Sequence, residues 1–343
     1  MEKIRAIVYE GAHDIRLEER EMPSVPGGWA LIRVTHAGIC GSDLTTYSGT
    51  HPRAKAPLVM GHEFAGYIAE DAPGLPKGTR VTAYPNFSCG KCLPCRSGNE
   101  HVCETLKVTG IDRDGAMADY IAVPVEKLVR LPDGVSNKLG AFIEPIAVTV
   151  HAVRESGYKP GDSAIVFGCG GIGMATAITL RQFGAKNLVM SEPDEVRADF
   201  ARSLGFEVIN PKECDVIAEA KARTNGDGFD WVFDCAGAQP VADVLFYVGK
   251  IKGTIAVIAS YKKNPSLPMA SGISRELNVR FNRVYRMVDF ELAVQMAQDE
   301  PDYEKVITHV LPFEQAQKGF DLLTTPGTGA IKVMYTTLDG ESE

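Results

Sequence analysis

The stretch Ser163-Ala-Ile-Val-Phe-Gly-Cys-Gly-Gly-Ile-Gly173 decides the fold of the second half of the chain. A short apolar run is followed at once by glycines with the spacing G-x-G-x-x-G, and a helical pattern covers residues 172–183. This order predicts a strand, a tight turn and a helix. Such a turn lets backbone amides approach a pyrophosphate, whose charge the helix N-terminus favours. A glycine-rich turn without any ligand has the same local pattern, so the motif alone does not establish a cofactor.

An acidic residue further along makes the dinucleotide interpretation more specific. Glu192 follows the next apolar run, nineteen residues after Gly173. A carboxylate there can accept hydrogen bonds from ribose hydroxyls and would repel a 2′-phosphate, which favours NAD over NADP. Arg197, one helical turn later, either contacts the same ribose or is a solvated surface charge. The predicted cofactor-binding residues are Gly168, Gly170, Gly171, Ile172, Gly173, Glu192 and Arg197.

Two kinds of sequence pattern divide the chain. Apolar runs at 187–191, 207–209, 229–234 and 254–259 alternate with helical stretches, one of them near 241–247, which predicts a doubly wound parallel sheet of the Rossmann type. Residues 1–150 instead carry short alternating runs with many Pro and Gly, which predicts a β-rich domain. We expect one domain at 1–150 and a second at 151–287. The tail 288–343, with a helix near 290–298, a polar link and a strand near 330–336, is too short to form a third domain and should complete the first.

The bulk composition excludes several classes of partner. The 343 residues carry a net charge of −8, and no Lys/Arg run could form the basic face that nucleic acids or anionic membranes require. No stretch approaches the roughly 20 apolar residues of a membrane span. The first ten residues alternate like a strand and lack the apolar core of a signal peptide. With eight cysteines and no secretion signal, we expect a cytoplasmic protein with reduced thiols.

A four-cysteine lobe predicts a structural metal. Cys89, Cys92, Cys95 and Cys103 have the spacing C-x2-C-x2-C-x7-C. Four thiolates suit a closed tetrahedral zinc site that ties down a loop with no core of its own. An iron–sulfur run would place the fourth cysteine sooner and follow it with Pro, whereas Glu104 follows here. Free or disulfide-bonded thiols explain three successive three-residue steps poorly, so zinc is favoured.

A second constellation lies apart from this lobe. Cys40 stands in Gly-Ile-Cys-Gly-Ser-Asp, and His62 and Glu63 follow about twenty residues later in Gly-His-Glu-Phe-Ala-Gly. A thiolate, an imidazole and a carboxylate can hold zinc while leaving one position open for substrate. A lone cysteine and a lone histidine are more often core residues, so spacing alone leaves both interpretations open.

All these motifs, in this order, resemble the medium-chain zinc-dependent alcohol dehydrogenases. The resemblance covers most of the chain, and the branch it resembles most contains the polyol (sorbitol-type), butanediol and threonine dehydrogenases. It implies an α/β protein with a β-rich GroES-like catalytic domain and a Rossmann NAD-binding domain, with the substrate cleft at their junction. It also implies one catalytic and one structural zinc per subunit. Members of the family form homodimers or homotetramers through edge strands of the nucleotide domain.

The resemblance also implies roles for individual residues. Cys40 and His62 would be ligands of the catalytic zinc. Glu63 resembles a glutamate that binds the metal in the polyol branch, and Glu144, in Ala-Phe-Ile-Glu-Pro, resembles one that binds it directly or through water. A carboxylate in place of the third thiolate makes zinc a stronger Lewis acid. We expect Asp43 to accept a hydrogen bond from the second nitrogen of His62.

The expected chemistry is hydride transfer from a secondary alcohol. Zinc at the site would lower the pKa of the substrate hydroxyl, and Ser42, two residues after Cys40, is placed to take the proton and relay it along the cofactor ribose. The hydride then passes to the nicotinamide. Several relatives carry a histidine five residues after this cysteine, where Thr45 stands here. Thr45 cannot titrate, so the end of the relay is open; His51 or water are the candidates.

The substrate is the least determined feature. Arg286 resembles an arginine that reaches a substrate hydroxyl in sorbitol-type enzymes, although Met287 replaces the tyrosine that follows it. Arg286 could bind a polyol, a carboxylate or a sulfonate, or form only a surface salt bridge. We predict NAD-linked oxidation of a small polyol, sugar alcohol or aldonate, with L-threonine or 2,3-butanediol as the alternative. A zinc-free reductase would lack these ligands, whereas an inactive dinucleotide-binding protein would keep only the fold.

Overall fold

The computed structural model describes residues 3–338, and the contact pattern divides the chain into two units. The first unit consists of Met1–Glu144 and Arg286–Glu343, and the second of Pro145–Tyr285. The first division falls within the opening turn of helix α4 (Ile143–Ser156). Within the described residues, no helix has the length and apolar character that a membrane span requires.

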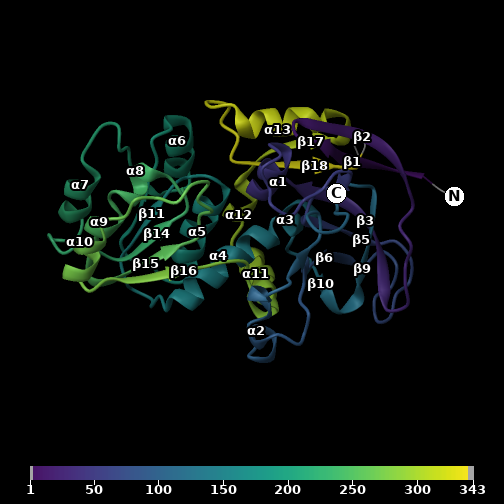
Figure 1. The fold of residues 1–343 in the computed structure, drawn as a ribbon, viewed down its shortest axis with the longest axis horizontal. Helices are drawn as coiled ribbons and strands as arrows, with labels where there is room; N and C mark the ends of the chain where they lie inside the picture. Colours follow the sequence, from purple (N-terminus) through teal and green to yellow (C-terminus); the bar gives the residue numbers. More distant parts are fainter. Residues whose placement is uncertain (1–2, 339–343) are drawn as a thin grey trace. The chain divides into compact units, whose positions relative to one another are not determined.

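The second unit contains one six-stranded sheet with the order β13-β12-β11-β14-β15-β16, and every pairing in it is parallel (Figure 1). The chain enters at β11, moves outward to β13, and then crosses back to β14. This reversal makes the sheet doubly wound, as expected from the alternating pattern. The strands are β11 (Ala164–Phe167), β12 (Leu188–Ser191), β13 (Glu207–Ile209), β14 (Phe229–Asp234), β15 (Gly249–Val257) and β16 (Asn278–Phe281).

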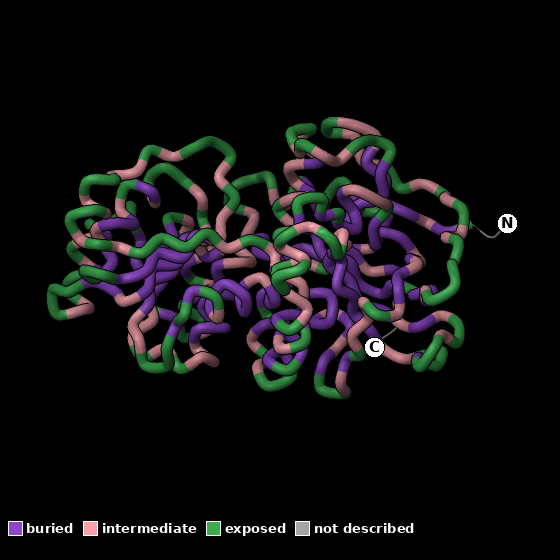
Figure 2. The backbone as a smooth tube through the Cα atoms, turned by 60° about the horizontal axis from the view of Figure 1, so that its bottom comes forward, coloured by how far each residue is buried: buried purple, intermediate pink, exposed green. Residues whose placement is uncertain are grey.

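The middle strands of this sheet are buried (Figure 2), whereas β16 at one edge is exposed. Ile165, Val232 and Ile255 lie on three adjacent strands, and all are inaccessible or nearly so. The single helix expected near 241–247 is wrong, because two short helices replace it. Between them the amide of Val244 donates to the carbonyl of Val241, a three-residue step in place of the four-residue step of an α-helix. The helices are α5 (Gly171–Gln182), α6 (Glu195–Ser203), α7 (Val216–Ala222), α8 (Gln239–Ala242), α9 (Leu245–Val248) and α10 (Met269–Ser274).

The first unit is rich in antiparallel strands. Its largest sheet has the order β10-β6-β5-β3-β18-β17, with β9 also paired to β3. A three-stranded sheet (β2-β1-β4) and a two-stranded one (β7-β8) complete it. The strands are β1 (Lys3–Gly11), β2 (Asp14–Glu21), β3 (Trp29–Gly38), β4 (Leu58–Val59), β5 (Glu63–Ile68), β6 (Arg80–Ala83), β7 (Asn86–Phe87), β8 (Lys107–Val108), β9 (Tyr120–Pro124), β10 (Leu128–Arg130), β17 (Ile307–Pro312) and β18 (Lys332–Thr336).

The C-terminal tail is more structured than the sequence indicated. We expected one helix, a polar link and a final strand, but β17 and α13 occupy the supposed link. In β17 the polar Thr308 and His309 mask the apolar alternation. The final strand β18 pairs antiparallel with β3, so the tail belongs to the largest sheet. The helices of this unit are α1 (Gly41–Tyr47), α2 (Leu93–Arg96), α3 (Asn137–Ala141), α11 (Met287–Asp299), α12 (Asp302–Lys305) and α13 (Ala316–Thr324).

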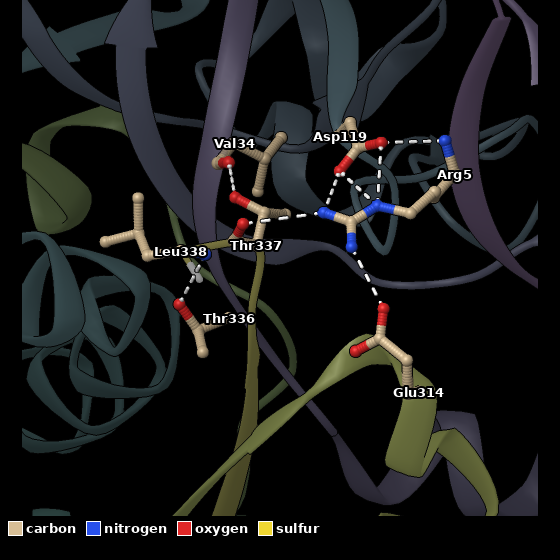
Figure 3. Close-up of polar contacts among 7 residues, drawn as sticks. All are labelled: Arg5, Val34, Asp119, Glu314, Thr336, Thr337 and Leu338. Atoms are coloured by element: carbon tan, nitrogen blue, oxygen red, sulfur yellow. Dashed lines mark hydrogen bonds and ion pairs between the residues drawn. The ribbon is translucent and has the colours of Figure 1, made fainter. Parts of the chain in front are cut away.

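A polar network joins the N-terminal strand to the C-terminal segment (Figure 3). The Arg5 amide donates to Asp119 Oδ2 at 2.7 Å, and the Arg5 guanidinium donates to Asp119 Oδ1 and Glu314 Oε1, each at 3.0 Å. The Thr337 hydroxyl donates to the carbonyl of Val34 at 2.5 Å. The Arg5–Asp119 bonds are charge-assisted and partly buried, and such bonds are stronger than neutral ones. They therefore help to hold residues far apart in sequence in one unit.

Glycine at position 66 is required by close strand packing. A Cβ added to Gly66 on β5 would lie 2.0 Å from the carbonyl oxygen of Arg33, a backbone atom that cannot move away alone. We expect Gly66→Ala to lower the free energy of unfolding by about 3 kcal/mol, because overpacking must displace the strand. Gly27→Ala is the control, since a Cβ there meets nothing within 4 Å. Thermal unfolding followed by circular dichroism tests this, and equal melting temperatures would contradict the packing argument.

Candidate active site and metal centres

The predicted catalytic ligands come together at the ends of two paired strands. Cys40 follows β3 and forms the N-cap of helix α1, while His62 and Glu63 stand at the start of β5. Because β3 and β5 pair antiparallel with Gly38 opposite Glu63, the end of one strand meets the start of the other. The ligand atoms of Cys40, His62 and Glu63 lie within 4.8 Å of one another. One metal ion can therefore contact all three.

The electrostatics of this cluster favour a bound cation. Burial lowers the pKa of His62, but the anionic groups of Cys40, Asp43 and Glu144 outweigh it, and the net pKa is well above its usual value. His62 Nδ1, Ser42 Oγ and Asp43 Oδ1 are buried without a hydrogen-bond partner. Buried polar atoms without partners are rare in folded proteins. The donor set, one thiolate, one imidazole and nearby carboxylates, fits a zinc ion.

The expected hydrogen bond between His62 and Asp43 is wrong. Asp43 instead caps helix α1, where its Oδ2 accepts the backbone N–H of Cys40 at 2.8 Å. The carboxylate thus serves the backbone of a ligand residue, because a helix start leaves N–H groups that need an acceptor. Burial, opposed by the charge of His62, raises the pKa of Asp43.

Glu63 has a partner that the sequence analysis missed. Its carboxylate forms an ion pair with the ammonium of Lys332, and both side chains are almost completely buried. Lys332 Nζ also donates to the carbonyl of Ile39 at 2.8 Å. A lysine inside the apolar alternation of the last strand was a signal for a buried charge, but its partner lies 269 positions earlier and could not be found by spacing.

Glu144 lies near this cluster without belonging to it. It stands in the first turn of α4 and is half-buried. Its charge adds to the effect of Cys40 and Asp43 in raising the pKa of His62, and to the effect of burial in raising the pKa of Tyr84. Its carboxylate is not among the ligand atoms that lie within 4.8 Å of one another in the cluster formed by Cys40, His62 and Glu63. The structure therefore brings three of the four expected catalytic ligands together and leaves Glu144 at the margin.

The four cysteines of the lobe form the second cluster, with all four sulfurs within 4.8 Å of one another. The Sγ–Sγ distance is 3.3 Å from Cys92 to Cys95, 3.8 Å from Cys92 to Cys103, and 4.0 Å from Cys89 to Cys95. A tetrahedral zinc with bonds of about 2.3 Å places its sulfurs about 3.8 Å apart. All four cysteines are free thiols. The spacing therefore fits a closed zinc site.

Backbone amides stabilise the thiolate form of two of these cysteines. The amides of Lys91 and Cys92 lower the pKa of Cys89 to about 6, and the amide of Cys89 lowers the pKa of Cys103. Burial and the neighbouring Cys92 raise the pKa of Cys95 to about 12. Thiolates are the zinc-binding form of cysteine. Two of the four ligands are thus stabilised by the loop itself, whereas Cys95 requires the cation.

The glycine-rich turn has the geometry that a dinucleotide site requires. Gly168 has a φ of +96°, and a Cβ on Gly173 would lie 1.8 Å from the Gly168 carbonyl oxygen. A Cβ on Gly170 would meet nothing within 4 Å. Helix α5 begins at Gly171, so its first N–H groups face the turn. Positions 168 and 173 need glycine for the fold, whereas Gly170 leaves space beside the helix start.

Glu192 anchors this turn to the sheet. It is buried at the end of β12, where Oε2 accepts the amide of Cys169 at 2.7 Å and Oε1 accepts the amide of Asp194 at 3.0 Å. Each carboxylate oxygen has a further lone pair, so the side chain retains capacity for a ribose hydroxyl. Arg197 lies half-buried in the first turn of α6, and its amide donates to Asp194.

Comparison with known proteins gives the family. The chain matches the profiles described as "Alcohol dehydrogenase GroES-like domain" over residues 26–133 and "Zinc-binding dehydrogenase" over residues 171–299. A 2-dehydro-3-deoxy-L-galactonate 5-dehydrogenase of Pseudoalteromonas atlantica is 32% identical over 320 residues, 92% of this chain and 94% of that protein. The chain belongs to the zinc-dependent alcohol dehydrogenase family. The predicted fold class and enzyme class, an NAD-dependent zinc alcohol dehydrogenase, are thereby confirmed.

Two further similarities extend over the whole dehydrogenase. A probable D-xylulose reductase A of Aspergillus clavatus is 30% identical over 329 residues, which cover 92% of each protein. The crystal structure of 2R,3R-butanediol dehydrogenase from Bacillus subtilis superposes with a TM-score of 0.90 at 29% identity, covering 98% of this chain and 100% of that one. The resemblance to the polyol and butanediol branch therefore extends from sequence motifs to the complete fold.

The predicted substrate residue of this dehydrogenase is bound to a buried carboxylate. Arg286 is the N-cap of α11, its amide donates to Asp289 Oδ2 at 3.0 Å, and its Nε lies 3.6 Å from the same oxygen. Asp289 is fully buried, so this ion pair is not a surface salt bridge. The arginine side chain therefore lies beside a buried negative charge.

Within the described part of the chain, no hydrogen bond joins the Ser42 side chain to a titratable group. The Thr45 hydroxyl donates to the backbone carbonyl of Ser42 at 2.8 Å, which leaves the Ser42 hydroxyl available. His51 Nδ1 accepts the amides of Arg53 and Ala54, and burial together with Arg53 lowers its pKa. Among the described residues, no hydrogen bond joins His51 to Ser42, so the exit of the proton stays a prediction.

Metal content tests the lobe directly. We expect Cys95→Ser to purify with about one zinc per subunit where the wild type holds two, because a closed tetrahedral site needs all four thiolates. Cys214→Ser is the control: Cys214 is also a free thiol but lies outside both clusters. Zinc is measured by inductively coupled plasma mass spectrometry on dialysed protein. Two equivalents retained in Cys95→Ser would contradict the assignment of this lobe.

Proposed function

We propose that this dehydrogenase oxidises a secondary hydroxyl of a small neutral polyol, with NAD as the acceptor. The observation that carries the proposal is the cluster of Cys40, His62 and Glu63, with the unpartnered hydroxyl of Ser42 beside it. A zinc ion there would supply a Lewis acid that lowers the pKa of a substrate hydroxyl. Cys40 and His62 would hold it, with a carboxylate from Glu63 or Glu144 as further ligand.

Ser42 is the proposed proton acceptor. Its Oγ is buried and makes no hydrogen bond within the described chain, which leaves both its lone pairs and its proton free for a relay. Thr45 engages only the Ser42 backbone carbonyl and does not compete for the hydroxyl. A serine passes a proton on as it receives one, so its role is transfer and not storage.

Glu192 is the proposed basis for choosing NAD over NADP. Its position is fixed by two backbone amides, so the carboxylate cannot swing away from an approaching ribose. A 2′-phosphate there would face a buried negative charge. NAD supplies the hydride acceptor, and the turn from Gly168 to Gly173 supplies backbone amides to its pyrophosphate. Arg197 is proposed as a weaker contact with the same ribose.

We infer a neutral substrate from the Arg286–Asp289 pair. Because Asp289 offsets the arginine charge, the pair suits hydroxyl groups better than a carboxylate. The galactonate and xylulose named for the two relatives leave both chemistries possible. NADH production from a panel of polyols, aldonates, 2,3-butanediol and L-threonine tests this. Turnover confined to aldonates would reverse the charge argument, and turnover confined to the diol or the amino acid would favour the alternative.

The exposed edge of the parallel sheet supports a homodimer, which we propose as the minimal assembly. The strand expected at 254–259 is interior, because β15 lies between β14 and β16. The strand at one edge of the sheet is β16, where Val279 is 39% and Phe281 is 78% exposed. An apolar edge with unpaired backbone groups favours pairing with another chain. Light scattering that showed a monomer at micromolar concentration would overturn this.

A cytoplasmic location is proposed from the cysteines. All eight are free thiols, and the four of the lobe must remain reduced to bind zinc. Fractionation of the native host with an antibody tests the location, and recovery from an oxidising compartment would contradict it.

Substitution of a proposed zinc ligand distinguishes the chemical step from NAD binding. We expect Cys40→Ser and His62→Ala to abolish NADH production while leaving NAD affinity largely intact, since the proposed cofactor residues stand in the other unit of the chain. His309→Ala is the control, because His309 lies on β17 outside both metal clusters. Turnover and NAD dissociation constants are measured on the same preparations. Wild-type turnover in either ligand variant would refute the zinc assignment.

Two glycines of the turn separate folding from cofactor binding. We expect Gly170→Ala to keep the wild-type melting temperature but to weaken NAD binding by on the order of tenfold, because its Cβ fills the space beside the helix start. Gly173→Ala should lower the melting temperature as well, since its Cβ meets the backbone of Gly168. Calorimetric titration with NAD measures the affinity. Unaltered affinity in Gly170→Ala would place the pyrophosphate elsewhere.

A further inference from the structure

Three neighbouring strands place a lysine beside the catalytic cluster. In the largest sheet β3 lies between β5 and β18, and its Gly38 stands opposite Glu63 on one side and Met334 on the other. Lys332 precedes Met334 by two residues, so its side chain emerges on the same face of the sheet. Glu63 and Lys332 therefore meet across the middle strand and form an ion pair there.

The contact depends on the absence of a side chain at Gly38. A Cβ at this position would lie 2.2 Å from Glu63 Oε2 and 3.1 Å from Lys332 Cε. Gly38 does not have a positive φ, so backbone conformation does not explain the glycine. The side chains of Glu63 and Lys332 occupy the space above Gly38 that a side chain at this position would fill.

Both charges are shielded from water. The side chains of Lys332 and Glu63 are 7% and 2% exposed. Lys332 Nζ also donates to the carbonyl of Ile39, the residue before Cys40, and lies 5.8 Å from the ring centre of Phe142. Burying an ion pair costs desolvation energy that well-packed apolar residues would avoid. The pair therefore calls for an explanation beyond stability.

The four expected ligands include one carboxylate more than a catalytic zinc with an open position can hold. A catalytic zinc keeps three protein ligands and one position for substrate. Cys40, His62, Glu63 and Glu144 together would fill all four positions and close the site. An open position requires that one of the two carboxylates stay off the metal. Glu144 stands outside the cluster of Cys40, His62 and Glu63, and Glu63, which belongs to it, is the carboxylate that forms an ion pair with an ammonium group.

We propose that Lys332 is a positioning residue that competes with zinc for the Glu63 carboxylate and so keeps a coordination position open for the alcohol. The inference rests on the zinc site of the proposed function. Two effects act in the same direction: the ammonium repels the metal ion, and it occupies the carboxylate that would otherwise bind the metal fully. Removing the lysine should therefore tighten zinc binding and hinder substrate binding.

The test measures how fast the catalytic zinc leaves. A colorimetric chelator added to the full-length enzyme releases two zinc ions, and the phase absent from Cys40→Ser belongs to the catalytic site. We expect Lys332→Met, which keeps the length and removes the charge, to slow this phase by on the order of tenfold. The kcat/KM for the alcohol should fall while NAD affinity stays the same. Lys332→Arg, which restores the charge, should restore both the release rate and kcat/KM.

Each outcome of this test either supports or overturns the proposed role of Lys332. Unaltered or faster release from Lys332→Met overturns the inference, because the lysine would then not compete with the metal. If Lys332→Met does not fold, Glu63→Gln replaces it: retention of the catalytic zinc supports a shared carboxylate, and its loss shows a permanent ligand and overturns the inference. A wild-type enzyme without the Cys40-dependent phase refutes the proposed zinc site itself, which distinguishes that failure from failure of the lysine's role.

Discussion

The pairing of β3 with β5 on one side and β18 on the other is the constraint on which the candidate active site depends. Antiparallel pairing puts the end of β3 beside the start of β5, and thus brings Cys40 to His62 and Glu63. The same pairing places Lys332, from the far end of the chain, over the glycine between them. A one-residue slip in register would turn each side chain to the opposite face. Sheet register therefore determines the donor set, its charge and its counter-charge together.

The two metal centres differ in how they are built. The lobe gathers four ligands from fifteen consecutive residues, and its own amides stabilise two of the thiolates. The other centre gathers ligands from separate strands and surrounds them with buried polar atoms that have no partner. Four thiolates that fill every coordination position make a structural zinc site, whereas a mixed set that leaves one position open allows a substrate to bind the metal. The physical contrast matches the division into structural and catalytic zinc.

Sequence patterns were reliable where the physical cause was local. The parallel strands and the first helices of the second unit follow from apolar runs and from turns with fixed glycines, and most bounds agree within a residue or two. Prediction failed at 241–247, where the helix divides at Val244, and in the tail, where polar residues mask β17. It also failed for Asp43, because capping a helix start competes with a histidine for the same carboxylate. In each case a tertiary or terminal requirement outweighed the local pattern.

By itself the sequence determined the types of candidate ligand and their spacing: four cysteines at fixed intervals, one cysteine and one histidine in short motifs, and glycines followed by an acidic residue. In each motif the residues are close together along the chain, so their spacing restricts how their side chains can be arranged. Only the tertiary structure decided that Glu63 joins Cys40 and His62, that Glu144 stays at the margin, and that Lys332 shares the Glu63 carboxylate. Those relations join residues up to 269 positions apart, and their energies come from burial and strand register, which no local pattern records.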